Sequence, residues 1–188
     1  MESIMTKLPN VIFEGPDATG KSTFINYLQE KYGYSSMSCG KHGKNDVQYF
    51  RDLLNLNNFA FDRHYISEYL FAILYNRERK LSFEDTEQLF KAVMDTGTIL
   101  VMFTTSDISI LNARFIERGE YDYLKEIDDQ LQLFNSYIEW IEKANYENLY
   151  IVDIAEPDGY NKVYQWLSNK IEEVANGKSE DNQSTSDS

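Results

Sequence analysis

The chain has 188 residues, 42% of them apolar and 14% aromatic, so it can bury one sizeable core but is short for two domains. Its formal net charge of −13 disfavours nucleic acid and anionic membranes as partners because both are polyanions, while a small anionic ligand in a locally basic pocket stays compatible. We expect a cytoplasmic protein without a membrane segment. The chain has a single cysteine, residues 1–10 lack the apolar core of a signal peptide, and no apolar run approaches the roughly 18 residues that span a bilayer.

The first predicted elements are a buried strand at residues 11–13 and an amphipathic helix from about residue 22, joined by the loop GPDATGKS. This loop fits the pattern G-x-x-x-x-G-K-[ST] of phosphate-binding loops at every fixed position. The glycines let backbone N–H groups approach a polyphosphate, the lysine reaches its β- and γ-phosphates, and the serine hydroxyl can ligate Mg²⁺. The residues expected to bind ATP are Gly15, Asp17, Ala18, Thr19, Gly20, Lys21, Ser22 and Thr23.

Strands and helices are predicted to alternate along the rest of the chain. Further strands are expected at residues 34–38, 59–61, 98–103 and 149–153, and further helices at about 46–56, 66–74, 110–119, 127–144 and 158–174. Such alternation favours an α/β fold, with a parallel sheet and right-handed crossovers. Residues 1–175 would form this one domain. Residues 176–188 contain no large apolar side chain, so we expect a disordered polar tail there.

Asp62, Arg63 and His64 directly follow a predicted strand, at the sheet edge where open α/β sheets bind ligands. Arg63 can hold an acceptor phosphate in a two-pronged contact, and Asp62 can accept from Mg²⁺-bound water or from a sugar hydroxyl. A structural ion pair at the strand end is the alternative for these two residues. His64 is expected to pack or cap rather than to catalyse.

Arg114 and Arg118 lie one helical turn apart, and Gly119 then ends the helix. Two arginines that close over a transferring phosphoryl group suit phosphoryl transfer, whose catalysis consists mainly of positioning and charge stabilisation. The alternative is a pair of solvated helix-end arginines that contact Glu117 or Glu120.

Three motifs in this order resemble the thymidylate kinase group of nucleoside monophosphate kinases, whose bacteriophage-encoded members are often this short. The motifs are Glu14-Gly15-x-Asp17-x-x-Gly20-Lys21-Ser22-Thr23, Asp62-Arg63-x-x-x-Ser67 and Arg114-x-x-x-Arg118-Gly119-x-x-Asp122. The resemblance implies a P-loop fold with a five-stranded parallel sheet, a homodimer, and ATP-dependent phosphorylation of a deoxynucleoside monophosphate such as dTMP. It also implies that Asp17 contacts the acceptor sugar, Arg63 the acceptor phosphate, and Arg114 and Arg118 belong to a lid. Tyr69 is a further candidate for acceptor contact.

The chain departs from the family pattern at three places. The arginine-proline stretch after the second strand is replaced by SMSCGKHGK, the glutamine that reads thymine is replaced by Phe71-Ala72, and Tyr123 stands where a lid arginine is usual. The related deoxynucleoside kinases, which phosphorylate a 5′-hydroxyl, carry a carboxylate at the end of the second strand, and Met37-Ser38-Cys39 offers none. A monophosphate acceptor needs no strong general base, which favours the monophosphate over the nucleoside.

Two other classes of function stay open. A nucleotide switch or ATPase would carry further motifs, but Asn161-Lys162-Val163-Tyr164 fails N-K-x-D at its last position, and no predicted strand ends in Asp-Glu. A kinase acting on a nucleic-acid hydroxyl conflicts with the acidic charge. Residues 40–44, with two lysines, are expected to form either a solvated loop or a contact for an acceptor phosphate.

Overall fold

A computed structural model of the chain describes residues 7–39 and 45–181, with side chains as far as residue 175. Five parallel strands form one sheet in the order β2-β3-β1-β4-β5. The strands are β1 (Val11–Glu14), β2 (Ser35–Ser38), β3 (Phe59–Asp62), β4 (Ile99–Thr104) and β5 (Leu149–Asp153). The predicted α/β fold with a five-stranded parallel sheet is confirmed.

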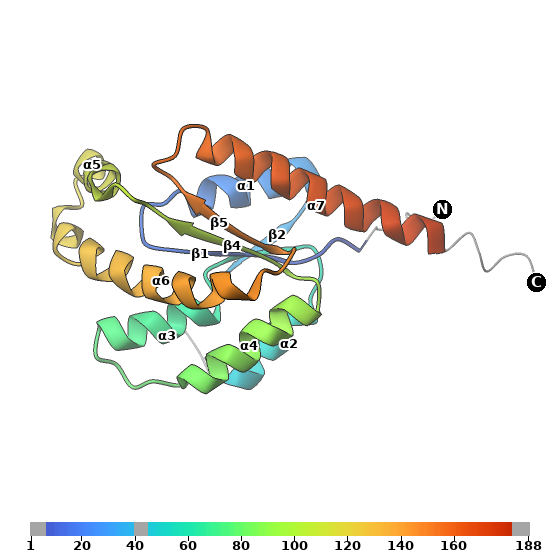
Figure 1. Cartoon of the computed structure of the whole chain (residues 1–188), viewed down its shortest axis with the longest axis horizontal. Helices are drawn as coiled ribbons and strands as arrows, with labels where there is room; N and C mark the ends of the chain where they lie inside the picture. The colour runs from blue at the N-terminus through green and yellow to red at the C-terminus, as the bar shows by residue number, and fades with distance from the viewer. Residues whose placement is uncertain (1–6, 40–44, 182–188) are drawn as a thin grey trace, which may run out of the picture.

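Helices cover both faces of the sheet, as Figure 1 shows. One face is covered by α1 (Lys21–Tyr32), α5 (Ile108–Arg118) and α7 (Gly159–Asp181), and the other by α2 (Val47–Leu54), α3 (Tyr65–Leu74), α4 (Phe83–Asp95) and α6 (Ile127–Ile141). Two short 3-10 helices, η1 (Tyr121–Lys125) and η2 (Glu142–Ala144), flank α6. The part of the chain that the structure describes contains no helix long and apolar enough to cross a membrane.

Side chains of the central strands alternate between two hydrophobic cores. Along β1, Val11 and Phe13 point to the α1, α5 and α7 side, whereas Ile12 points to the α2, α3, α4 and α6 side. All three side chains are fully buried. The near-continuous apolar runs of β1 and β4 therefore follow from burial on both faces, as is typical of parallel sheets.

Two features of the fold differ from the sequence prediction. Helix α4 was missed, although Ser82 and Asp85 form a capping box at its start and its apolar residues Leu89, Phe90 and Val93 are buried in the core. Helix α7 continues to Asp181 instead of ending near Val174, so the first residues of the expected tail are helical. Extending an existing helix needs no new nucleation, which explains why polar residues join it. Residues 40–44 and 182–188, for which a loop and a tail were expected, lie outside the described residues.

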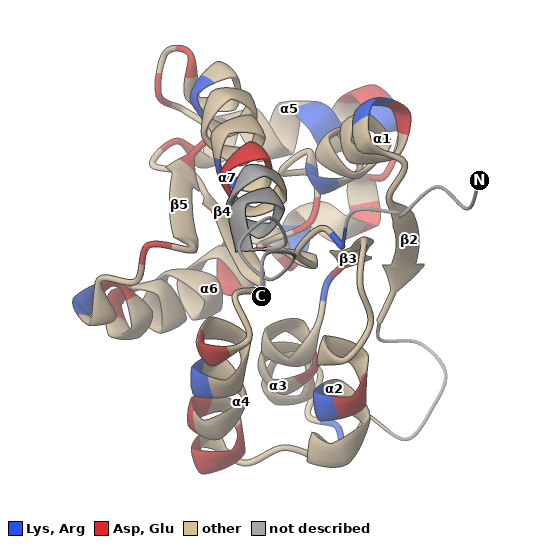
Figure 2. Cartoon of the chain, turned by 90° about the vertical axis from the view of Figure 1, so that its right-hand side faces the viewer, with Lys and Arg blue, Asp and Glu red and all other residues tan. Residues whose placement is uncertain are grey.

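Acidic residues lie on several helix surfaces, among them those of α4 and α7 in Figure 2. Together with the acidic residues elsewhere in the sequence, they give the net charge of −13. The arginines discussed below gather instead at the carboxyl end of the sheet, where β1 and β3 end. The sheet thus places its cationic groups at the edge where an anionic ligand would bind.

Candidate active site

The loop between β1 and α1 is tightly packed at both of its glycines. Gly15 has φ 143°, and a Cβ there would lie 2.6 Å from the carbonyl oxygen of Phe103. Gly20 has φ 92°, and a Cβ there would lie 2.9 Å from the Tyr160 hydroxyl oxygen. Both positions therefore need glycine on steric grounds, as the phosphate-loop pattern predicts.

Lys21 is buried, and its side chain lies against the backbone of this loop. Its Nζ donates to the carbonyl oxygens of Gly15 (3.0 Å) and Pro16 (2.7 Å). Burial, and then the positive charge of Arg63, lower the pKa of Lys21 to about 7. Ser22 and Thr23 are exposed in the first turn of α1, where a hydroxyl and the helix dipole can meet an anion or its metal ion. The loop residues predicted to bind the nucleotide are thus brought together around Lys21.

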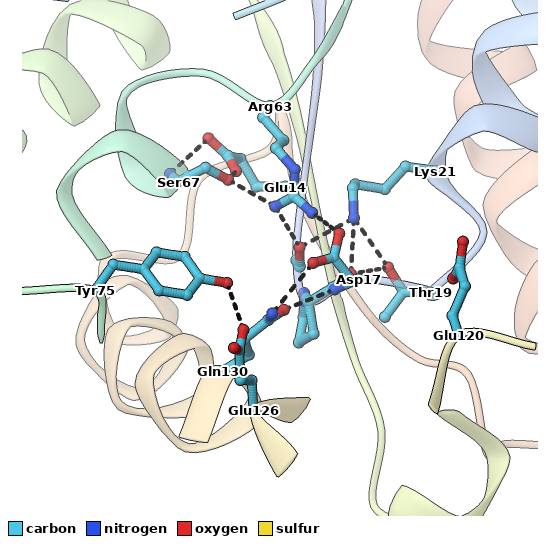
Figure 3. Close-up of polar contacts among 12 residues, drawn as sticks. Glu14, Asp17, Thr19, Lys21, Arg63, Ser67, Tyr75, Glu120, Glu126 and Gln130 are labelled. Atoms are coloured by element: carbon cyan, nitrogen blue, oxygen red, sulfur yellow. Dashed lines mark hydrogen bonds and ion pairs between the residues drawn. The ribbon is translucent and has the colours of Figure 1, made fainter. Parts of the chain in front are cut away.

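Arg63, at the end of β3, is joined to the phosphate loop. Its guanidinium forms an ion pair with Asp17 and donates to the Gly15 carbonyl oxygen and the Ser67 hydroxyl, both at 3.2 Å. Its Cζ also lies 4.6 Å from the ring centre of Phe71. The structure therefore places Arg63 at the loop, and it shows that Asp17 and Arg63 contact one another. Figure 3 shows this cluster.

Glu14 anchors the same cluster from below and was not predicted as a site residue beyond its place in the motif. Its buried carboxylate accepts from the backbone N–H groups of His64 (2.7 Å) and Ser67 (3.2 Å), and from the Ser67 hydroxyl. Burial raises the pKa of Glu14 despite these bonds. Glu14 thereby fixes the first turn of α3 to the end of β1, and with it the residue that holds Arg63.

Gln130, on α6, holds Asp17 from the other side. Its Oε1 accepts from the Asp17 backbone N–H and its Nε2 donates to the Asp17 carboxylate, both at 3.1 Å. Burial would raise the pKa of Asp17, but the charges of Arg63 and Lys21 outweigh it, so this pKa lies below its ordinary value. The Asp17 carboxylate is thus a charged, doubly held part of the loop (Figure 3). Sequence reasoning missed Gln130, whose only signal was a polar residue on the buried face of an amphipathic helix.

Arg114 and Arg118 do not act as one pair. Arg114 donates to the Ala18 carbonyl oxygen (2.6 Å) and to the Tyr160 hydroxyl (2.8 Å), which itself donates to the Thr19 carbonyl oxygen (2.8 Å). Arg118 lies 3.9 Å from Glu120, with 52% of its side chain exposed. Arg114 therefore supports the loop backbone, whereas Arg118 stays open to solvent and to the neighbouring cavity.

Three further candidates occupy different environments. Asp62 has one buried carboxylate oxygen, Oδ1, without a hydrogen-bond partner among the described residues. His64 is fully buried among aromatic rings, and burial lowers its pKa to about 3, which agrees with the packing role expected for it. Tyr69 packs against Phe83, with ring centres 6.2 Å apart, rather than against the cavity described next.

A cavity of about 850 Å³ opens beside the phosphate loop. The loop residues Asp17 and Ala18 line it, as do the arginines Arg63, Arg77 and Arg118. Its remaining wall includes Asp62 and the residues Asn45, Tyr49, Glu68 and Phe71 of the α2 and α3 region. The cavity is large enough for a nucleotide and joins the predicted phosphate-binding residues to a polar and aromatic pocket.

Comparison with known proteins identifies the architecture. No family model and no curated protein sequence matches the chain. Among solved structures, the YorR protein of Bacillus subtilis in complex with phosphorylated GDP superposes with a TM-score of 0.66 at 22% identity, over 85% of this chain and 95% of that chain. The chain has the fold of the P-loop kinases.

Two other structures with the P-loop kinase fold are similar at lower identity. Deoxyadenosine kinase of M. mycoides with bound dATP has a TM-score of 0.51 and 15% identity, over 85% of this chain and 99% of that chain. A gluconokinase of Sinorhizobium meliloti 1021 has a TM-score of 0.52 and 11% identity, over 94% of this chain and 97% of that chain. The last two are named for different substrates, so the shared fold does not identify the acceptor of this chain, which has to be argued from its own cavity.

Proposed function

We propose that the protein transfers the γ-phosphoryl group of ATP to a nucleoside monophosphate, with dTMP-like deoxynucleotides as the class that the family resemblance implies. The observation that carries the proposal is the cavity of about 850 Å³ that begins at the phosphate loop and is lined by Arg63, Arg77 and Arg118. A donor triphosphate on the loop and an acceptor phosphate among these arginines would lie next to one another, which is the positioning that phosphoryl transfer requires.

Each residue has a role in this proposal. Lys21 neutralises the β- and γ-phosphates, for which it must exchange the carbonyl oxygens of Gly15 and Pro16 for phosphate oxygens. Arg63 orients the acceptor phosphate, and Arg118 brings a further positive charge from the exposed end of α5. Arg114 and Gln130 keep the loop in shape through Ala18 and Asp17 and need not touch the transferring group.

The residues present fit a magnesium ion. Mg²⁺ binds few protein oxygens and keeps several waters, which suits the exposed Ser22 hydroxyl together with the Asp62 carboxylate, whose Oδ1 has no hydrogen-bond partner within the described part of the chain. These two residues would hold the ion. When bound, it would neutralise charge on the phosphates of the nucleotide.

A second candidate is a kinase for the 5′-hydroxyl of a nucleoside. It is favoured by Asp62, whose buried Oδ1 lacks a partner among the described residues and whose side chain lines the cavity. A carboxylate there could accept the proton of an attacking hydroxyl, a role that Ser38 and Cys39 at the end of β2 cannot take. The similarity to deoxyadenosine kinase is compatible with a nucleoside acceptor. The similarity to YorR, which was solved with phosphorylated GDP, is compatible with a nucleotide ligand.

The test is an ADP-release assay with Mg²⁺-ATP and each nucleoside, each nucleoside monophosphate and a DNA oligonucleotide as acceptor. Turnover with a monophosphate supports the main proposal, whereas turnover with a nucleoside and none with its monophosphate supports the second candidate. ATP hydrolysis that no acceptor stimulates would favour a switch or ATPase instead. The family resemblance also implies a homodimer, which light scattering of the same sample would test.

A further inference from the structure

One wall of the cavity carries a carboxylate that the phosphate chemistry does not use. Glu68 lies on α3 and lines the cavity, where the Asn45 side-chain amide donates to its Oε2 at 2.8 Å. Asn45 is 6% exposed and Glu68 is half-buried. The pair therefore presents a fixed, oxygen-rich edge to whatever fills this part of the cavity.

The surroundings of this edge suit a flat ring. Tyr49 and Phe71 line the same cavity, and Phe71 already stacks beneath the guanidinium of Arg63 at 4.6 Å. Aromatic side chains offer faces on which a nucleobase stacks. The cavity also reaches the phosphate loop at Asp17, so a nucleoside with its phosphate or 5′-hydroxyl at the loop can extend its base towards Glu68.

The donor pattern of the base decides which base fits. A carboxylate only accepts hydrogen bonds, and each of its oxygens can accept more than one. Guanine presents two adjacent donors, the ring N1–H and the 2-amino group, which match the two carboxylate oxygens. Thymine and uracil place one N–H between two carbonyl oxygens, and adenine and cytosine place an amino group beside a ring acceptor. Each of these four bases would turn at least one lone pair towards the carboxylate, which disfavours it.

We propose that Glu68 selects guanine as the base of the acceptor, and that Asn45 positions the Glu68 carboxylate. This inference rests on the proposed function and refines it: a nucleoside monophosphate stays the acceptor, but guanine replaces the dTMP-like base that the family resemblance implies. It also accounts for the apolar Phe71 and Ala72, which stand where the family resemblance expects a thymine-reading glutamine.

The test begins with the unmodified protein and compares GMP, dGMP and guanosine with IMP, dTMP, dAMP and dCMP by calorimetry. Guanine compounds should bind most tightly, and IMP, which lacks only the 2-amino group, should bind about ten- to a hundredfold more weakly than GMP because one charge-assisted hydrogen bond is lost. Tighter binding of dTMP, or equal binding of GMP and IMP, would overturn the proposal without any variant.

Glu68→Gln then tests the residue, with Glu139→Gln on the exposed face of α6 as the matched control. The first variant should remove the GMP-to-IMP ratio, and the control should keep it. A merely structural Glu68–Asn45 contact predicts lower stability with an unchanged ratio, which would refute the proposal. Turnover assays distinguish failure of the proposed function from failure of the base assignment. Binding of guanine nucleotides without phosphorylation refutes only the kinase assignment. Phosphorylation of a nucleotide with another base in preference to a guanine nucleotide refutes only the base assignment.

Discussion

Replacing Arg114 or Arg118 by alanine should give opposite results, although the two residues lie one turn apart on α5. Arg114 donates to the Ala18 carbonyl oxygen at 2.6 Å and the Tyr160 hydroxyl at 2.8 Å, and its side chain is half-buried. Hydrogen bonds of a charged donor contribute about 1.5–3 kcal/mol each, so with partial exposure their joint loss should cost about 2–4 kcal/mol. For a chain of this length that is a fall in Tm of about 5–15 °C.

Arg118→Ala should leave stability within about 0.5 kcal/mol, because its contact with Glu120 is 3.9 Å long and largely exposed. Turnover should instead fall by about a hundredfold or more if the arginine meets the transferring group only on closure. Thermal denaturation and steady-state kinetics of the two variants form the assay, with Arg114→Lys as a control that keeps the charge. A stable Arg114→Ala protein together with an unstable Arg118→Ala protein would refute this division of roles.

Three further predictions concern the phosphate loop. Because burial lowers the pKa of Lys21 to about 7, nucleotide binding should take up a proton at pH 8 and weaken as pH rises above about 7. The unfolding free energy of the free protein should rise from pH 7 towards 10, because the unfolded chain then binds the proton more tightly. Calorimetry in buffers of different ionisation enthalpy should show the proton uptake, and Lys21→Met should abolish both the uptake and turnover. Arg63→Lys should weaken acceptor binding by about ten- to a hundredfold with little change for ATP, whereas equal losses for both ligands would make Arg63 structural. Gly20→Ala should destabilise by about 1–3 kcal/mol. Because the new Cβ meets the Tyr160 hydroxyl at 2.9 Å, Gly20→Ala should cost less in a Tyr160→Phe background than in the unchanged chain, as measured by urea denaturation; equal costs would show that backbone strain at φ 92° dominates.

The sequence alone predicted those parts of the fold that depend on residues close together in the chain. The glycine spacing of residues 15–22 and the apolar runs of β1 and β4 each act over fewer than ten residues, so the loop, the strands and the sheet class followed from them. Helix α4 was within reach as well, because Ser82 with Asp85 is a recognisable helix start.

The contacts that shape the loop are of another kind. Gln130 lies 113 residues from Asp17, and Tyr160 lies 141 residues from Thr19. No periodicity or motif in one sequence encodes such pairs, since each depends on how α6 and α7 dock against the sheet. Arg114 is a further example. Its spacing of one helical turn from Arg118 was predicted correctly, but its contact with the Ala18 carbonyl oxygen of the loop depends on how α5 docks and was not predicted.

The strand order has an evolutionary consequence. Because β1 lies at the centre of the sheet, the chain visits β2 and β3 on one side before it crosses to β4 and β5 on the other. Under the proposed function, the wall that would discriminate acceptor bases, with Asn45, Tyr49, Glu68 and Phe71, is encoded by one uninterrupted segment between the phosphate loop and β4. The residues that brace the donor loop, Arg114, Gln130 and Tyr160, come after it. Exchange of a single continuous stretch could therefore retarget such an enzyme while its ATP machinery is inherited intact.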